Sequence, residues 1–256
     1  MRNTFNKKLI EFAKKDKDIY LLTADLGYNS FENFKNLFPK RFINVGVAEN
    51  NLVGIACGLA LRKKKVYVYS ILPFLIFKSF EQIRNNICHN NLNIKLIGGG
   101  GGFSYSVQGI SHNTSEDISV LRSMPNIEIF NPGTIKETEN TMDAISILKS
   151  PCFVRLGKAP KVDYLNLNNF DINKPNIFKK GKDLVIFTSG NIIQEVNDSC
   201  IELENNKISV KIVSVVKIKP ISVLSFKKLI NNNHILVIEE HSDIGGLASI
   251  IRDIIV

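Results

Sequence analysis

Short runs of nearly continuous apolar residues alternate along this chain with segments of helical period. The strand-like runs are IYLLTAD at 19–25, FINVG at 42–46, KVYVYSI at 65–71, NIKLIG at 93–98, IEIFNP at 127–132 and CFVRLG at 152–157. Helical spacing fills the intervals, at about 3–15, 49–61, 77–88, 114–122 and 134–149. Buried apolar strands that alternate with helices are typical of a mainly parallel sheet covered on both faces. We therefore predict an α/β domain over residues 1–157.

A second, smaller α/β domain is predicted after a break in this pattern. Residues 158–181 lose the periodicity and are rich in Pro, Asn and Lys, which is typical of a linker. The alternation resumes over 182–256, with strands expected at 183–190, 209–216 and 234–241 and helices around 192–205 and 222–231.

Charge and composition narrow the classes of partner. The 256 residues carry 33 Lys and Arg against 24 Asp and Glu, a net charge of +9, and 44% are hydrophobic. The lysines are dispersed, without the interleaved aromatic residues of a single-strand binder, so we interpret them as solvated surface and predict no nucleic-acid partner.

The N-terminal segment has no apolar signal region, and no run approaches the roughly 18 apolar residues of a membrane span. We predict a cytoplasmic protein without membrane contact.

The cysteines give no sign of a metal or disulfide site. Cys57, Cys88, Cys152 and Cys200 lie far apart and include no CxxC pair. This spacing favours reduced, partly buried thiols over a zinc site or a disulfide framework. We therefore expect no metal ligated by this chain.

Glu49 is an acid at a strand-to-helix junction, surrounded by small and apolar residues in NVGVAENNLVGIACGLAL. Either a functional role or stabilisation of the helix dipole explains a carboxylate in a first helical turn. The glycine run 98–102 is a second candidate, since glycines after a strand allow a ligand to approach the backbone closely. A flexible loop explains the same run, which fits neither the GxxxxGK[ST] nor the GxGxxG motif.

His112 lies in the polar segment QGISHNTSED, where a histidine either serves acid–base chemistry near neutral pH or caps the following helix. Phe74, Phe77 and Phe80 recur at every third residue, which predicts that they line one face of a helix. Such a stripe either packs in the core or walls a flat pocket for a heteroaromatic ring. The residues alone leave these alternatives open.

Five segments in register resemble the C-terminal half of transketolase-like thiamin diphosphate enzymes. They are TADLG at 23–27, RFINVGVAENNLVGIACGLAL at 41–61, YSILPFLIFKSFEQIRNNI at 69–87, GISHNTSEDISVLRSMPNIEIFNP at 109–132 with PCFVRLGK at 151–158, and ILVIEEHSDIGGLAS at 235–249. The resemblance implies a pyrimidine-binding domain over 1–157 and the family's C-terminal domain over 182–256. It also implies that this second domain stops short of the family's usual end.

The resemblance implies cofactor-binding roles for five residues. Glu49 occupies the position of the glutamate that hydrogen-bonds N1' of the cofactor aminopyrimidine and so promotes loss of the thiazolium C2 proton. Phe74, Phe77 and Ile71 match the wall around the pyrimidine. Asp25 matches an aspartate near the cofactor at the subunit interface.

The resemblance also implies substrate-binding roles. His112 matches a substrate-facing histidine that binds donor or acceptor oxygens and shuttles protons, so with Glu49 it forms the expected catalytic pair. Gln108 stands where the family usually has an acid that recognises a sugar hydroxyl, and an amide supplies no charge. Arg2 and Lys158 match cations that hold substrate phosphate or carboxylate, whereas the glycines around Gly100 replace a phosphate-binding histidine.

The family's magnesium-binding GDG segment, which belongs to a separate pyrophosphate-binding domain, is absent from this sequence. The resemblance therefore implies a partner subunit that holds Mg²⁺ and the diphosphate end of thiamin diphosphate, in an α2β2 assembly. The leading hypothesis is the pyrimidine-side subunit of a two-chain enzyme that transfers a two-carbon ketol unit from a ketose to an aldose. A beta subunit of a 2-oxo acid dehydrogenase-type enzyme, a deoxyxylulose-phosphate-synthase-like activity and a non-catalytic relative remain alternatives.

Overall fold

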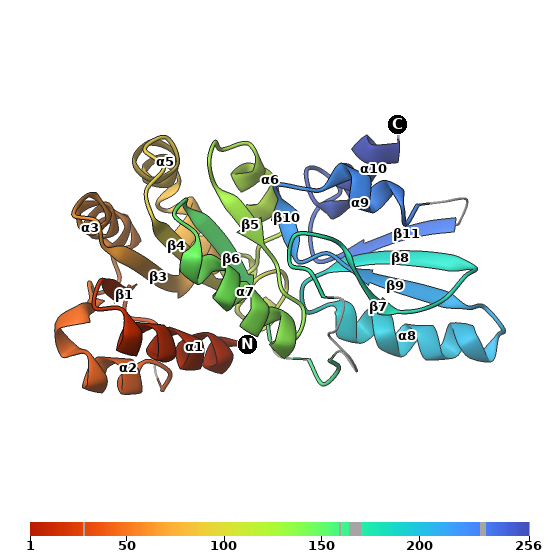
Figure 1. The fold of residues 1–256 in the computed structure, drawn as a ribbon, viewed down its shortest axis with the longest axis horizontal. Helices are drawn as coiled ribbons and strands as arrows, with labels where there is room; N and C mark the ends of the chain where they lie inside the picture. Colours follow the sequence, from red (N-terminus) through yellow and green to blue (C-terminus); the bar gives the residue numbers. More distant parts are fainter. Residues whose placement is uncertain (28, 159, 164–169, 231–233, 256) are drawn as a thin grey trace.

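Two sheets lie side by side in a computed structural model of the chain, which describes residues 1–256 apart from 28, 159, 164–169, 231–233 and 256 (Figure 1). Seven strands form the first sheet in the order β10-β5-β6-β4-β3-β1-β2. Their bounds are β1 (Ile19–Thr23), β2 (Phe42–Asn44), β3 (Lys65–Ile71), β4 (Ile94–Gly99), β5 (Glu128–Phe130), β6 (Cys152–Leu156) and β10 (Lys217–Lys219). All pair in parallel except β10, which runs antiparallel to β5. The predicted α/β fold with a mainly parallel first sheet is confirmed.

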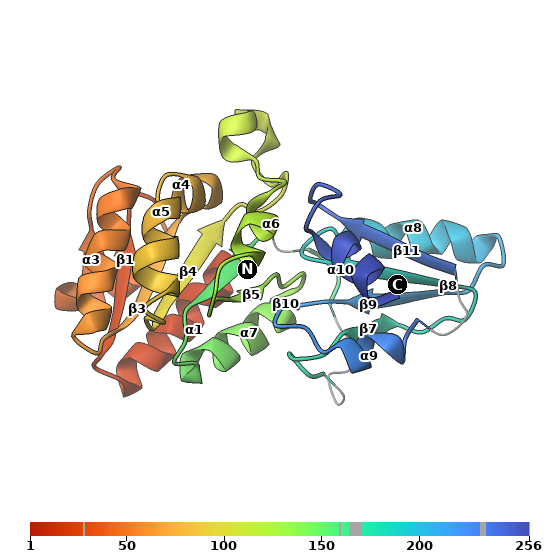
Figure 2. The same cartoon turned by 90° about the horizontal axis from the view of Figure 1, so that it is seen from above.

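Helices cover both faces of the first sheet (Figures 1 and 2). One face packs against α1 (Arg2–Lys15), α2 (Glu32–Leu37) and α7 (Ile135–Ile147). The other packs against α3 (Glu49–Leu61), α4 (Leu72–Phe77), α5 (Phe80–Gln82) and α6 (Asp117–Arg122). Successive strand residues point to opposite faces, so Tyr67 and Tyr69 pack on the α1 side while Val66 and Val68 pack on the α3 side.

The second sheet has the order β11-β8-β9-β7 and confirms the predicted smaller α/β domain. Its strands are β7 (Asn176–Lys179), β8 (Leu184–Ser189), β9 (Val210–Ser214) and β11 (His234–Glu239), all parallel except β7. Helix α8 (Ile193–Asn205) covers one face, and α9 (Val223–Lys227) and α10 (Leu247–Ile255) cover the other. The apolar cluster under α9 and α10 continues into the α3 side of the first sheet, so the two domains share a core. None of the helices in the described residues is both long and apolar enough to cross a membrane.

Two short strands lie where the sequence predicts none. β7 falls inside the predicted linker 158–181, and β10 follows β9 directly yet joins the first sheet. Both strands have only three or four residues, so no alternating pattern distinguishes them from loop. Residues 159 and 164–169 of the segment, and residue 231 of the helix expected around 222–231, lie outside the described residues.

The prediction that Phe74, Phe77 and Phe80 share one helical face is wrong. Helix α4 ends at Phe77, α5 starts at Phe80, and a π-helical turn covers Ile83–Cys88. Ser79, with φ −111° and ψ 15°, departs from helical dihedrals between the two helices. A periodic pattern in the sequence does not reveal a two-residue interruption of this kind, which reorients the side chains on either side of it.

Candidate active site

Glu49 is the first residue of α3, and its side chain is buried at the carboxyl-end edge of the parallel strands. Ser70, near the end of β3, donates from Oγ to Glu49 Oε1 at 3.3 Å. Lys78, in the turn after α4, donates from Nζ to Glu49 Oε2 at 3.1 Å. The carboxylate therefore lies at the favourable end of a helix dipole and has a hydroxyl and a cation as partners.

A chain of contacts links Glu49 to His112. The Lys78 ammonium lies 4.6 Å from the centroid of the Phe74 ring. Phe74 in turn meets the His112 imidazole edge-on, with ring centroids 5.0 Å apart and planes at 73°. Three residues predicted for the site are thus brought together, and Lys78, which the sequence analysis missed, connects them.

His112 lies on a segment between β4 and α6 that extends beyond the rest of the first domain (Figure 2). Two 3₁₀ turns, Ser106–Gln108 and Ile110–His112, meet at Gly109, whose φ of +80° favours glycine. Ser111 Oγ lies 2.9 Å from His112 Nδ1, and Gln108 is exposed. We call residues 103–116 the histidine segment.

A buried ion pair anchors the histidine segment to both domains. Arg155 of β6 donates from Nε and Nη2 to the Asp117 carboxylate of α6, at 2.9 and 3.1 Å. The same guanidinium donates to the carbonyl oxygens of Thr114 and Glu240, at 3.1 and 2.9 Å. Glu240 Oε1 accepts from the backbone N–H of Phe103 at 3.1 Å. The start and the end of the segment are therefore tied to the residue that follows β11 of the second domain.

The glycine run 98–102 packs against Tyr105 and Glu240. It is therefore not the flexible loop that its composition allowed. Gly102 has φ +62°, and a Cβ there would lie 2.6 Å from Cβ of Glu240. Gly100 has φ +80°, and a Cβ there would lie 2.0 Å from the Tyr105 ring. Both positions exclude any side chain.

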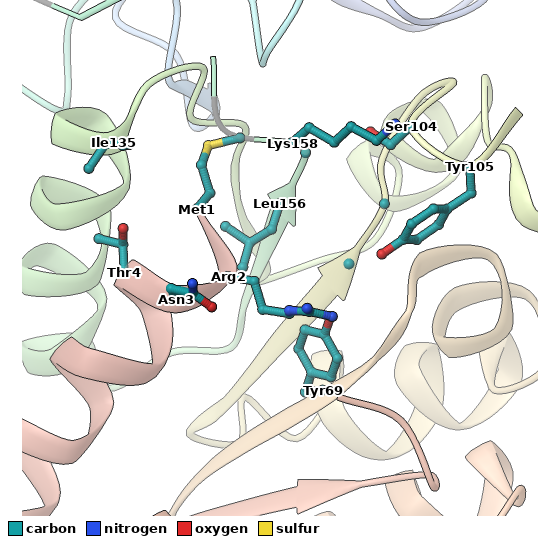
Figure 3. Close-up of a pocket in the computed structure, with 13 residues that line it drawn as sticks. Met1, Arg2, Asn3, Thr4, Tyr69, Ser104, Tyr105, Ile135, Leu156 and Lys158 are labelled. Carbon is teal, nitrogen blue, oxygen red and sulfur yellow. The ribbon is translucent and has the colours of Figure 1, made fainter. Parts of the chain in front are cut away.

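A pocket of about 520 Å³ opens at the same sheet edge, on the α1 side (Figure 3). Arg2, Tyr69, Gly100 and Lys158 are among its lining residues, so the two cations predicted to bind substrate share one cavity. The Arg2 and Tyr69 side chains lie close together (Figure 3), and burial raises the pKa of Tyr69 to about 12, which keeps its hydroxyl neutral near pH 7. The pocket is suited to an anion, since it combines a guanidinium, an ammonium and a hydroxyl.

The other residues predicted to bind the cofactor come from the loop after β1, the end of β3 and the end of α4. Asp25 follows β1 and is exposed, and its Oδ1 accepts from Asn44 Nδ2 at 3.0 Å. Asn44 Oδ1 accepts in return from the backbone N–H of Asp25, at 2.8 Å, which joins the loops after β1 and β2. Ile71 ends β3 and is half-buried, whereas Phe77 is 39% exposed. The sequence analysis missed Asn44 and Lys78, because neither carries a local signal for a contact so distant along the chain.

Metal-ligating groups do not cluster in the part of the chain that the structure describes. No three His, Cys, Asp or Glu side chains within it are placed to hold a metal ion. The four cysteines are free, and all four are buried, which is more than the partial burial expected from the sequence.

Two family models match most of the chain. The transketolase pyrimidine-binding domain matches residues 1–160, and the transketolase C-terminal domain matches 173–256. The chain is 34% identical over 259 residues to a putative transketolase C-terminal section of Methanocaldococcus jannaschii, a match that covers 100% of this chain and 81% of that protein. It is 31% identical over 254 residues to one of the subunits of the apulose-4-phosphate transketolase of Phocaeicola vulgatus, which covers 98% of this chain and 81% of that protein.

A solved structure agrees with these matches. A split-gene transketolase, described as an inactive β4 tetramer, superposes with a TM-score of 0.88 at 29% identity, over 99% of this chain and 83% of that one. The domain order, the sheet topology and these similarities lead to one conclusion. The chain belongs to the transketolase family, with a pyrimidine-binding domain followed by a transketolase C-terminal domain.

Proposed function

We propose that this chain is the pyrimidine-side subunit of a two-chain, thiamin diphosphate-dependent transketolase that moves a two-carbon ketol unit from a ketose to an aldose. The observation that carries the proposal is the buried Glu49 carboxylate at the start of α3, in contact with Ser70 and Lys78. A helix dipole stabilises an acid in the first turn by only about 0.3–1 kcal/mol, which is less than the desolvation cost of a buried carboxylate. Replacing it by an apolar residue would avoid the desolvation cost of a buried charge.

The described residues fit the pyrimidine end of the cofactor. Glu49 offers carboxylate oxygens to a ring N–H, and the half-buried Phe74 offers an aromatic surface beside it. When bound, thiamin diphosphate supplies the carbon nucleophile that attacks the ketose carbonyl. Glu49 would hold a proton at the pyrimidine N1', while His112, packed on Phe74, would exchange protons with the substrate hydroxyls. Asp25, Ile71 and Phe77 complete the proposed cofactor surface.

The pocket lined by Arg2, Tyr69 and Lys158 supports a substrate with an anionic end. Arg2 and Lys158 would bind a phosphate or sulfonate there, and Tyr69 and the glycine backbone would add hydrogen bonds. Relatives support this class of substrate, since one is named as part of an apulose-4-phosphate transketolase and another as part of a 6-deoxy-6-sulfo-D-fructose transketolase. Gln108, exposed on the histidine segment, would recognise a sugar hydroxyl without charge.

A partner subunit is part of the proposal. It would supply the diphosphate-binding half of the site together with Mg²⁺, in an α2β2 assembly. Similar proteins support it: one solved structure is described as an inactive β4 tetramer of a split-gene transketolase, and two relatives are named as subunits of transketolases. The cytoplasmic location stays a prediction from the sequence.

Ketol transfer assayed in the presence of the partner subunit tests this function. Product formation from a phosphorylated ketose and an aldose should require both chains, and Glu49→Ala should abolish it while leaving the fold intact. Arg2→Met should raise KM for the phosphorylated ketose and change KM for an unphosphorylated ketose much less. An active Glu49→Ala variant would contradict the proposal. Transfer of an acyl unit from a 2-oxo acid in place of ketol transfer would favour the dehydrogenase-type alternative.

A further inference from the structure

Lys78 contacts Glu49 and Phe74, the two side chains that bind the aminopyrimidine in the proposed function. Its Nζ lies 3.1 Å from Glu49 Oε2 and 4.6 Å from the centroid of the Phe74 ring. We propose that Lys78 is a competing cation, which occupies these two anchor points in the free subunit and leaves them when thiamin diphosphate binds. This inference rests on the proposed function and adds a residue that sets cofactor affinity.

The free subunit needs a cation at this place. The Glu49 side chain is 1% exposed, and a carboxylate removed from water to this extent is costly without a charged partner. Ser70 supplies one neutral hydrogen bond, and that bond is long, at 3.3 Å. Lys78 therefore compensates the charge of Glu49 as long as no other donor is present.

The contacts of Lys78 are suited to release. Its side chain is 49% exposed, so solvent competes for the ammonium and weakens the ion pair. The residue lies in the turn after α4 ends at Phe77, so a rotation of its long side chain frees Glu49 without moving a helix. An aromatic ring that hydrogen-bonds Glu49 Oε2 and stacks on Phe74 would compete with this ammonium, because the ammonium contacts both groups.

Removal of Lys78 changes cofactor affinity in opposite directions, depending on whether the lysine competes with the cofactor or attracts it. A lysine that served to attract the diphosphate, or to hold the site in shape, would weaken cofactor binding when removed. A competing lysine strengthens binding when removed, since Glu49 is then unpaired until a new donor arrives. The sign of the change in affinity therefore distinguishes the two roles.

The test is calorimetric titration of thiamin diphosphate with Mg²⁺ into the complex of this chain with its diphosphate-binding partner subunit. Lys78→Met should bind roughly two- to fivefold more tightly than wild type, as expected for loss of a half-exposed ion pair. Lys78→Gln, a second variant without charge, should tighten binding likewise. Lys78→Arg should stay near wild type, and so should Lys180→Met, which removes an exposed lysine of the second domain.

Two further readouts separate competition from other causes. The ratio of the wild-type to the Lys78→Met dissociation constant should shrink as salt is raised, because salt screens the ion pair of the half-exposed Lys78. In a Glu49→Gln background, Lys78→Met should no longer tighten binding. Unchanged or weaker binding by Lys78→Met and Lys78→Gln, in assembled complexes, would overturn the role of Lys78 as a competing cation and leave the proposed function standing. A wild-type complex that fails to bind thiamin diphosphate would overturn the proposed function, and this inference with it.

Discussion

Asp117→Asn is expected to destabilise the protein strongly, because it removes the counter-charge of a buried guanidinium. The side chains of Arg155 and Asp117 are 3% and 0% exposed, and two hydrogen bonds of 2.9 and 3.1 Å join them. Asparagine has the same shape, so the variant changes charge without creating a cavity. The guanidinium then stays buried with only carbonyl oxygens as partners.

The magnitude follows from the burial. Removing one partner of a buried ion pair costs about 3–5 kcal/mol. Arg155 keeps its bonds to the carbonyl oxygens of Thr114 and Glu240, which favours the lower end, about 3 kcal/mol. At roughly 2–4 °C per kcal/mol for a chain of this size, the melting temperature should fall by about 6–12 °C.

Thermal unfolding followed by circular dichroism checks this prediction, with Asp143→Asn as the matched control. The Asp143 side chain is 55% exposed in its pair with Lys8, so that variant should lose no more than about 1 kcal/mol. Arg155→Met and the double variant complete a cycle, whose coupling energy should exceed about 1.5 kcal/mol. If Asp117→Asn melts within a degree or two of Asp143→Asn, the anchor assigned to this pair is refuted.

Three further predictions concern a proton, a helix cap and two thiols. Burial raises the pKa of the Glu240 carboxyl above its ordinary value of 4.5, so the folded protein holds the carboxyl proton more tightly than the unfolded chain does. The free energy of unfolding should therefore fall as the pH rises from 4.5 toward the pKa of Glu240 in the folded protein. Glu240→Gln should flatten the dependence of the melting temperature on pH across that window; an unchanged slope would contradict the shift. Thr134→Ala should cost about 1 kcal/mol in urea unfolding, because the Thr134 side chain and Glu137 form a capping box at the start of α7. Burial raises the pKa of the Cys57 and Cys88 thiols to about 11, so alkylation by iodoacetamide near neutral pH should be slow in the folded protein and fast in urea; rapid labelling without denaturant would disprove their burial.

The sequence predicted what depends on periodicity and on an unusual residue in a local context. The apolar runs predicted every strand of the first sheet except β10. Glu49 was identifiable because an acid among small apolar residues at a helix start requires an explanation. The helix predicted at about 134–149 is observed as α7, Ile135–Ile147.

Contacts between distant segments could not be predicted in the same way. Lys78 and Glu49 are 29 residues apart, and a lysine after an aromatic stripe is ordinarily solvated. One signal was available and unused: Arg155 lies inside a strand expected to be buried on both faces, so it required a buried partner. The identity of that partner, Asp117, depends on how α6 packs against β6, which no local pattern specifies.

We propose that this chain supplies the pyrimidine half of a cofactor site that another subunit completes. Calorimetric titration of thiamin diphosphate with Mg²⁺, into the chain alone and into its mixture with the diphosphate-binding subunit, tests this claim. Tight binding in the mixture only, lost when Glu49 is replaced by Ala, is the predicted result. The claim is contradicted if the wild-type mixture binds no cofactor, or if the Glu49→Ala mixture binds it as tightly as wild type.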